Sequence, residues 1–479
     1  MKNGDSQLAY ASIGDIGKLF RQGKLSPVDL TRILLDRIER INPRVNAYIT
    51  VCQELAMEMA GQAEGELCTR TRRKSRRDRG PLHGIPISLK DNIYTKDVRT
   101  TGGSKILKEF VPLHDAPIVA AMKKAGAVIL GKTNMHEFAY GVTTENPHFG
   151  PVRNPWDLER TAGGSSGGSA AALAAGLCCG SIGTDTGGSI RIPSSLCGVV
   201  GLKPGLGRVN AGDIIPLSPT LDFVGPLARS VEDVALLLDP IFVKGKKERK
   251  LVPGKVPSSR GRRPCLGIPK QFFLEVLDPE VEAAFENALR RLEKRGARLR
   301  EVSLPRLLET EDAGNQIAWA EATLYHQQAG WFPGHAADYG QDVRTRLEMG
   351  EKVSAVNYLR AREFREKFKQ LFLEVFTANG LHALVVPTTP IPAPRMGEDS
   401  VLIKGSAHPT RALLLRLNRP ANLAGVPAIS VPCGVTTSGL PIGLQFIAAW
   451  TDEALLLEIA REFERESPLM GRPELESLA

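Results

Sequence analysis

The spacing of apolar residues predicts that the chain begins with helices. Residues 26–29 (Ser-Pro-Val-Asp) have the sequence of a helix N-cap with proline in the first turn. Apolar residues then recur at helical spacing from Leu30 to Ile38. We therefore expect a helical N-terminal region over residues 1–65.

Short apolar runs bounded by glycine or proline predict buried strands further along the chain. Two helical stretches, 116–126 and 278–297, each lead directly into such a run. This alternation indicates an α/β layered fold. Strand signals occur toward both ends of the sequence around one Gly/Ser-rich centre, so we expect a single large domain, 1–479. The strand-like runs are 84–89, 127–130, 298–304, 383–387 and 441–448.

The composition is that of an ordinary globular protein. Of 479 residues, 42% are hydrophobic and 24% are charged, which provides ample apolar side chain for a core. No stretch has the 18 or so apolar residues of a membrane helix, and the N-terminus lacks a signal-peptide pattern. We expect a cytoplasmic protein that does not associate with membranes.

The net charge of +9 is concentrated in one short segment. Residues 70–79 hold seven basic residues and one acid, so the rest of the chain carries only about +3. No aromatic residues interleave these charges, as they do in many nucleic-acid sites. We predict exposed loops at 68–80 and at 244–263, a second basic and Gly/Pro-rich stretch, and no nucleic-acid partner.

The cysteines and histidines predict neither a disulfide framework nor a metal centre. The seven cysteines are scattered and include no C-x-x-C pair. The eight histidines show no metal-ligand spacing. We expect no metal and no cofactor.

Residues 126–133 (GAVILGKT) match the P-loop pattern letter for letter. A P-loop needs flexible residues between its glycines, after a strand and before a helix. Here those positions are Ala-Val-Ile-Leu, which must themselves form the strand. The pattern therefore does not predict a nucleotide site.

Two Gly/Ser tracts, 163–168 and 185–189, are surrounded by apolar runs. A flexible linker is the usual meaning of such tracts, but the first passes directly into strong helix formers at 169–175. Residues 163–167 also match G-x-S-x-G, the nucleophile elbow of α/β-hydrolases. The segment before Ser165 is loop-like, and His326, His335, His382 and His408 have no distinguishing context, so an esterase of that class stays an alternative.

The tracts suggest backbone amides arranged as an oxyanion hole. A serine nucleophile needs a base, and Lys90, at the end of the buried run 84–89, is the candidate. Burial disfavours the ammonium form of lysine and makes the neutral amine available as a base. This reasoning gives a Ser-Lys pair and leaves open whether Ser165 is nucleophile or relay.

Three motifs resemble the amidase signature family in order and spacing: GIPISLKDN (84–92), GGSSGGSAAA (163–172) and DTGGSIRIP (185–193). Further similar segments at 133–141, 198–204, 385–394 and 422–434 extend the resemblance over most of the chain. The resemblance implies the amidase signature fold, with a central mixed sheet covered by helices on both faces. It also implies an amidase that cleaves a carboxamide bond.

The resemblance assigns roles to individual residues. Lys90, Ser165 and Ser189 correspond to a Ser-cisSer-Lys triad in which Ser189 is the nucleophile and forms an acyl-enzyme. The oxyanion hole corresponds to Thr186, Gly187 and Gly188, with the amide of Ser189. Substrate contacts are expected from Tyr140, Arg191 and Arg346, although Arg191 also fits a structural role.

The identity of the amide is less determined. Related glutaminase subunits of the tRNA-dependent amidotransferase carry an aspartate shortly before the NLAGVP motif, where this chain has Leu415. We therefore expect a stand-alone amidase acting on a small-molecule amide, with a homodimer left open. The glutaminase subunit of a tRNA-dependent amidotransferase is the alternative.

Overall fold

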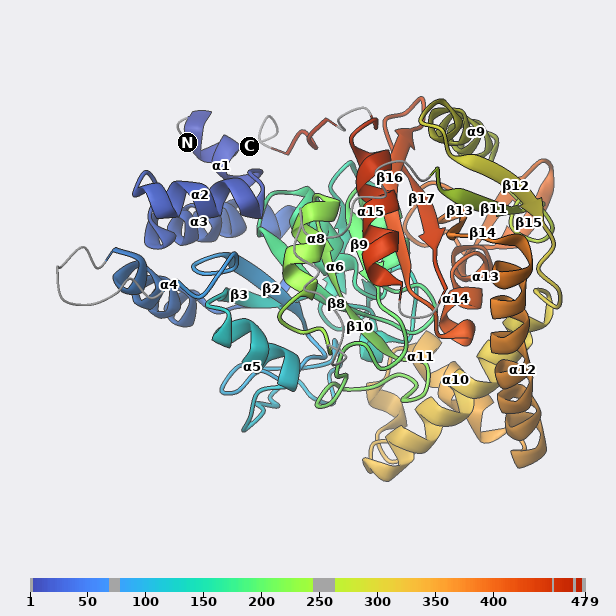
Figure 1. Cartoon of the computed structure of the whole chain (residues 1–479). Helices are drawn as coiled ribbons and strands as arrows, with labels where there is room; N and C mark the ends of the chain where they lie inside the picture. The colour runs from blue at the N-terminus through green and yellow to red at the C-terminus, as the bar shows by residue number, and fades with distance from the viewer. Residues whose placement is uncertain (1–2, 69–77, 244–262, 450–451, 468–470, 476–479) are drawn as a thin grey trace.

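A mixed sheet of 11 strands lies at the centre of the chain in the computed structural model (Figure 1), which describes residues 3–68, 78–243, 263–449, 452–467 and 471–475. The predicted loops 68–80 and 244–263 lie mostly outside the described residues. In spatial order the strands are β1 (Tyr48–Val51), β3 (Val128–Thr133), β2 (Pro86–Lys90), β8 (Gly180–Asp185), β10 (Phe223–Ala228), β9 (Val200–Lys203), β16 (Ala428–Val435), β17 (Pro441–Ile447), β13 (Ala383–Pro387), β11 (Cys265–Pro269) and β12 (Arg298–Val302).

The sheet combines two parallel regions with an antiparallel centre. The strands β3, β2 and β8 are parallel, as are β13, β11 and β12, whereas the neighbours from β8 to β13 pair antiparallel. The predicted α/β class and mixed sheet are thereby confirmed. Three small hairpins lie outside the sheet: β4 (Glu145–Asn146) with β5 (Gly150–Pro151), β6 (Arg153–Asn154) with β7 (Asp157–Thr161), and β14 (Ser400–Ile403) with β15 (Ser406–Pro409).

Helices pack against the sheet, and a further group of helices lies beside one end of it (Figure 1). Helices α6 and α7 contact each other, and α8 contacts α15, against the central strands. Helices α10, α11 and α12 pack together beside α14 in a separate layer. The helices are α1 (Asn3–Ala9), α2 (Ile13–Gln22), α3 (Pro27–Val45), α4 (Gln53–Cys68), α5 (Pro117–Lys124), α6 (Gly167–Ala174), α7 (Arg191–Cys197), α8 (Val231–Leu238), α9 (Pro279–Lys294), α10 (Glu309–Gln328), α11 (Gln341–Glu351), α12 (Ala355–Asn379), α13 (Thr410–Arg416), α14 (Arg419–Ala424) and α15 (Glu453–Glu464).

Local sequence signals account for several of these boundaries. The Ser26 hydroxyl accepts the Val28 amide at 3.0 Å, and α3 starts at Pro27 as predicted. The N-terminal region is mainly helical, but it also contributes β1, which pairs with β3. The pattern around residues 48–51 is too short to predict an edge strand without its partner.

The segment that matches the P-loop pattern, residues 126–133, contains a strand. Residues Val128–Thr133 form β3, and Lys132 is fully buried with its ammonium donating to the carbonyl of Ile93 and to Thr100. A lysine used in this way cannot hold a phosphate. The structure thus agrees with the interpretation of this segment as a core strand.

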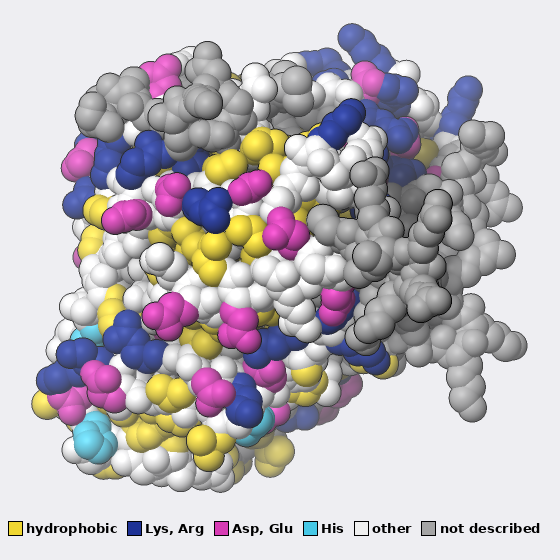
Figure 2. All heavy atoms as spheres, turned by 90° about the vertical axis from the view of Figure 1, so that its left-hand side faces the viewer, with side chains coloured by type: hydrophobic (Ala, Val, Ile, Leu, Met, Phe, Trp, Pro, Cys, Tyr) yellow, Lys and Arg dark blue, Asp and Glu magenta, His cyan; other side chains and the backbone are white. Residues whose placement is uncertain are grey.

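On the face shown in Figure 2, acidic and basic side chains are interspersed over the part of the surface that the structure describes. No helix among the described residues is long and apolar enough to cross a membrane.

Candidate active site

The three motifs meet where two parallel strands end side by side. Strands β2 and β8 pair in parallel, with Leu89 opposite Ile182. The residue at the end of β2 is Lys90, and the second Gly/Ser tract follows β8. Carboxyl ends of parallel strands share one sheet edge, which brings segments almost a hundred residues apart into one site.

Lys90 is fully buried and hydrogen-bonded to two hydroxyl groups. Its Nζ donates to Ser165 Oγ at 2.8 Å and to Thr184 Oγ1 at 2.7 Å. Burial lowers the pKa of Lys90 to about 7, against the opposing influence of Asp222 and Asp185. Near neutral pH a substantial fraction of this lysine is therefore an uncharged amine.

Ser165 lies at a tightly packed turn. The Gly164–Ser165 peptide bond is cis, and Ser165 is fully buried. A Cβ at the nearby Gly168 would lie 2.3 Å from the carbonyl oxygen of Asn134, so only glycine fits there. The tract is thus part of the core and is not a linker.

Ser189 lies on the turn that follows β8 and borders a pocket. Its carbonyl oxygen accepts the Ser166 amide at 3.2 Å, which ties the two Gly/Ser tracts together. Among the described residues, the hydroxyl of Ser189 makes no hydrogen bond. Ligand-free catalytic sites often hold such groups slightly apart.

The carboxylate of Asp185 shapes the Ser189 turn. It accepts the amides of Gly188 at 2.8 Å and Ile190 at 3.1 Å. The Gly188 amide is therefore used inside the protein and is not available to an oxyanion, contrary to the expectation for that residue. Within the described chain, no partner takes the amides of Thr186, Gly187 and Ser189.

Arg191 lies beneath this turn and does not border the pocket. Its side chain is fully buried and forms a two-pronged ion pair with Asp185, with both N···O distances 3.0 Å. The remaining donors go to the side chains of Gln445 and Asn422 and the carbonyl of Asn418. All five N–H groups of the guanidinium are thereby used, which leaves none for a substrate.

Two residues that the motifs did not single out complete the surroundings of the lysine. Thr184 contacts Lys90 directly. Asp222 accepts the Thr186 hydroxyl and the amides of Leu217 and Ser218. Burial raises the pKa of Asp222 to about 6, while its hydrogen bonds and Lys90 oppose that rise. Thr184 lies in the strand that precedes Asp185 and could have been found from that position, whereas Asp222 carries no such signal.

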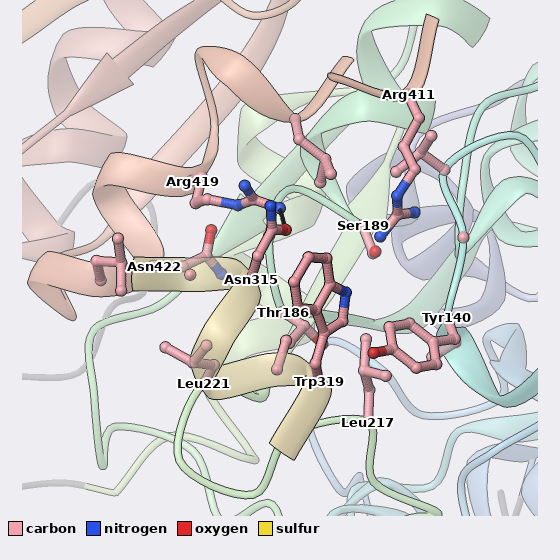
Figure 3. Close-up of a pocket in the computed structure, with 18 residues that line it drawn as sticks. Tyr140, Thr186, Ser189, Leu217, Leu221, Asn315, Trp319, Arg411, Arg419 and Asn422 are labelled. Carbon is pink, nitrogen blue, oxygen red and sulfur yellow. Dashed lines mark hydrogen bonds between the residues drawn. The ribbon is translucent and has the colours of Figure 1, made fainter. Parts of the chain in front are cut away.

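A pocket opens over Ser189 (Figure 3). Tyr140 lines it as expected, and its buried hydroxyl has no hydrogen-bond partner among the described residues. Burial raises the pKa of Tyr140 well above its usual value, so the hydroxyl stays protonated. Distant helices supply other walls: Asn315 and Trp319 from α10, Arg411 and Leu415 from α13, and Arg419, Asn422 and Leu423 from α14.

Arg346 lies behind the pocket wall and does not border the pocket. Its guanidinium pairs with Asp342 at 2.8 Å and donates to the carbonyl oxygen of Tyr140 at 2.5 Å. Arg346 therefore positions Tyr140, and the guanidinium groups that border the pocket are those of Arg411 and Arg419. Sequence reasoning missed both, because nothing local distinguishes them from other arginines.

The structure does not support the α/β-hydrolase alternative. The strand before Ser165 is β7, which belongs to a small hairpin and not to the central sheet. None of the histidines lines the pocket. His326 contacts Tyr339 at 2.7 Å, and burial lowers its pKa to about 3. In the part of the chain that the structure describes, no group of three or more His, Cys, Asp or Glu side chains could hold a metal ion.

Comparison with known proteins identifies the family. Residues 29–457 match the Amidase family, and the chain belongs to that family. A solved structure titled as an amidase superposes with a TM-score of 0.87 at 34% identity, covering 96% of this chain and all of that one. The amidase-signature resemblance and the fold that it implied are thereby confirmed.

Relatives of a second kind match equally well, and each is named as one subunit of glutamyl-tRNA(Gln) amidotransferase. The relative from Syntrophus aciditrophicus is 38% identical, with 97% of this chain and 99% of the relative covered. The relative from Carboxydothermus hydrogenoformans is 37% identical, with 98% and 100% covered. The Thermotoga maritima structure of the same subunit has a TM-score of 0.79 at 33% identity over 98% of both chains.

These relatives correct the expectation about partners. We expected a small-molecule amide and no nucleic acid, and that expectation is wrong, because full-length relatives are named as one subunit of an enzyme of tRNA. The error has a physical origin. The motifs encode a site for cleaving amides, and they carry no information about what else the protein binds.

The Asp185–Arg191 pair provides a test of what holds the site together. Replacing Arg191→Met leaves the Asp185 carboxylate buried without its partner, so we expect a loss of roughly 3–5 kcal/mol in the free energy of unfolding. The control Arg344→Met breaks an exposed pair with Glu348 and is expected to cost at most about 1 kcal/mol. Urea unfolding at neutral pH measures both.

The pKa of Asp185 also predicts how the free energy of unfolding changes with pH. Burial alone would raise the pKa of Asp185, but Arg191 and Asn422 hold it at about 2. The stabilisation is therefore present above the ordinary carboxyl pKa and is lost as the pH falls toward about 2. Equal losses in the two variants would contradict a structural role for Arg191.

Proposed function

We propose that this chain is the amide-cleaving subunit of a tRNA-dependent amidotransferase and that it cleaves through a Ser-cisSer-Lys triad. Neutral Lys90 accepts the proton of Ser165 as Ser165 takes the proton of Ser189. Ser189 Oγ attacks the amide carbonyl carbon, and the amides of Thr186, Gly187 and Ser189 receive the oxyanion. The relay returns the proton to the leaving nitrogen, ammonia departs, and water cleaves the acyl-enzyme.

The observation that carries this proposal is the contact between Lys90 and Ser165 under a pocket bordered by Ser189. A lysine with a pKa near 7 is a competent base at neutral pH. Both serines are buried, but Ser189 lines the pocket and Ser165 does not, which supports Ser165 as relay and Ser189 as nucleophile. Thr184 orients the amine by accepting a second hydrogen bond.

The role within an amidotransferase rests on the relatives. Similarity at 37–38% identity over nearly the whole length of both chains leaves no large segment of the relatives unmatched. The ammonia released at Ser189 would then be passed to a partner subunit. The donor amide is a separate question, because Leu415 borders the pocket where the related glutaminase subunits carry an aspartate.

Replacing Ser189→Ala removes the nucleophile and is expected to lower kcat/KM for ammonia release by at least about a thousand-fold. The control Ser194→Ala removes a serine on the next helix whose hydroxyl donates to the carbonyl of Ile190, and activity should stay within a few-fold of wild type. Mass spectrometry after fluorophosphonate treatment should find the label on Ser189. Label on Ser165 or an active Ser189→Ala enzyme would refute the assignment.

The pH profile reports on Lys90. Because the neutral amine is the active form, kcat/KM should rise with pH, with an inflection near 7, and level off above it. Asp222 favours the ammonium form, so Asp222→Asn should move the inflection to lower pH. An unshifted inflection in this variant would exclude Lys90 as the titrating group.

Amide transfer tests the role within an amidotransferase. The purified chain, combined with the companion subunits of the host's amidotransferase, glutamyl-tRNA(Gln), ATP and a donor amide that the chain cleaves, should convert the charged tRNA to its amidated form in a Ser189-dependent reaction. Acid gel electrophoresis or mass analysis of the aminoacyl group measures that conversion. The positive control is an established amide-cleaving subunit of this enzyme. Ser189-dependent ammonia release with no amidated tRNA, under conditions where that control works, would contradict the proposed role.

A further inference from the structure

We infer that the amide donor carries a carboxylate on its acyl side and no ammonium group, and that Arg411 binds that carboxylate. This inference rests on the proposed cleavage at Ser189 and specifies its substrate class. It concerns the pocket walls contributed by α10, α13 and α14, which none of the catalytic motifs includes.

Arg411 is a cation beside the nucleophile that has no partner within the described chain. Its side chain reaches toward Ser189 from α13 (Figure 3), and both residues border the pocket. No hydrogen bond or ion pair among the described residues involves its guanidinium, and burial together with Arg346 and Arg419 lowers its pKa to about 9. It remains charged at neutral pH, and an anionic ligand would supply the missing partner.

The neighbouring cation is already engaged. Arg419 donates to Asn315 at 2.9 Å and to the carbonyl of Glu311 at 3.0 Å. This holds a second guanidinium at the pocket wall, where it adds positive charge. Because Arg346, Arg411 and Arg419 lie near one another, the pocket favours an anion and opposes a cation.

No acidic side chain lines the described pocket, although Asp342 behind it opposes the lowering of the Arg411 pKa. The residues that line it include neither Asp nor Glu. Asp342 is paired with Arg346 and His136 outside the pocket. Leu415 borders the pocket one helical turn after Arg411. An ammonium group on the donor would therefore meet an apolar side chain and two guanidinium groups.

Tyr140 adds a neutral donor to the same pocket. Its hydroxyl is buried, protonated and without a partner among the described residues. A carboxylate can accept from both a guanidinium and a phenol. Glutamine satisfies only half of this requirement, because it carries an ammonium beside its carboxylate.

The test compares matched donors by ammonia release. Malonamate, succinamate and glutaramate are each paired with the neutral amide of the same carbon number, and glutamine is compared with glutaramate, from which it differs by one ammonium. In the wild-type enzyme, kcat/KM for the best anionic donor should exceed that of its neutral partner and of glutamine by about tenfold or more, as expected for a charge-assisted contact.

Variants test whether Arg411 causes the preference for anionic donors. Arg411→Gln should lower kcat/KM for the anionic donor about 10- to 100-fold more than kcat/KM for its neutral partner, and urea unfolding checks that the variant folds. The control Arg416→Gln, on the same helix, changes a guanidinium that stacks on Phe272 and lies outside the pocket. Leu415→Asp should raise kcat/KM for glutamine relative to that for glutaramate, because the new carboxylate provides a counter-ion for the ammonium group of glutamine.

The outcomes separate the two proposals. Equal turnover of anionic and neutral amides, a wild-type preference for glutamine, or an equal loss for all donors in Arg411→Gln would overturn the inference while leaving cleavage at Ser189 intact. Absence of Ser189-dependent release from every donor would refute the proposed function itself.

Discussion

The buried carboxylate of Asp185 is the interaction on which the rest of the site depends. It holds the turn that carries Ser189 through the amides of Gly188 and Ile190, and it pairs with Arg191 on the following helix. It also accepts from Asn422 on α14, whose neighbours border the pocket. One charged group therefore fixes Ser189, the proposed nucleophile, relative to the walls of the pocket. Burying it is tolerable because several donors satisfy its lone pairs.

A second constraint is that the buried lysines have different hydrogen-bond partners. Lys132 and Lys203 donate to backbone carbonyls and serve the core. Lys90 instead faces two hydroxyl groups, and neither neutralises its charge. Burial lowers the pKa of all three lysines, so Lys90 differs from the other two in that both of its hydrogen-bond partners are hydroxyl groups. The same residue type is thus structural or reactive according to the partners that the fold supplies.

The residues that we propose for catalysis and those that we propose for recognition come from different parts of the chain. Lys90, Ser165 and Ser189 lie in the first 190 residues, near the ends of neighbouring strands. The pocket walls that carry the positive charge lie on α13 and α14, and α10 adds to them, more than a hundred residues later. Such a division is compatible with the two kinds of relative that this chain matches, which are named as an amidase and as amidotransferase subunits.

The sequence by itself determined the strand that ends at Lys90, the helix start at Ser26 and the identity of the amide-cleaving motifs, because these depend on residues close together in the chain. It could not determine that Asp185 accepts a hydrogen bond from the Gly188 amide, that every N–H group of Arg191 has a partner inside the core, or that Arg346 lies behind Tyr140. Those outcomes depend on which donors and acceptors compete at one point in space. The tertiary structure alone decided that Arg411 lies beside Ser189 with no partner in the described chain, since its neighbours there come from distant segments of the sequence.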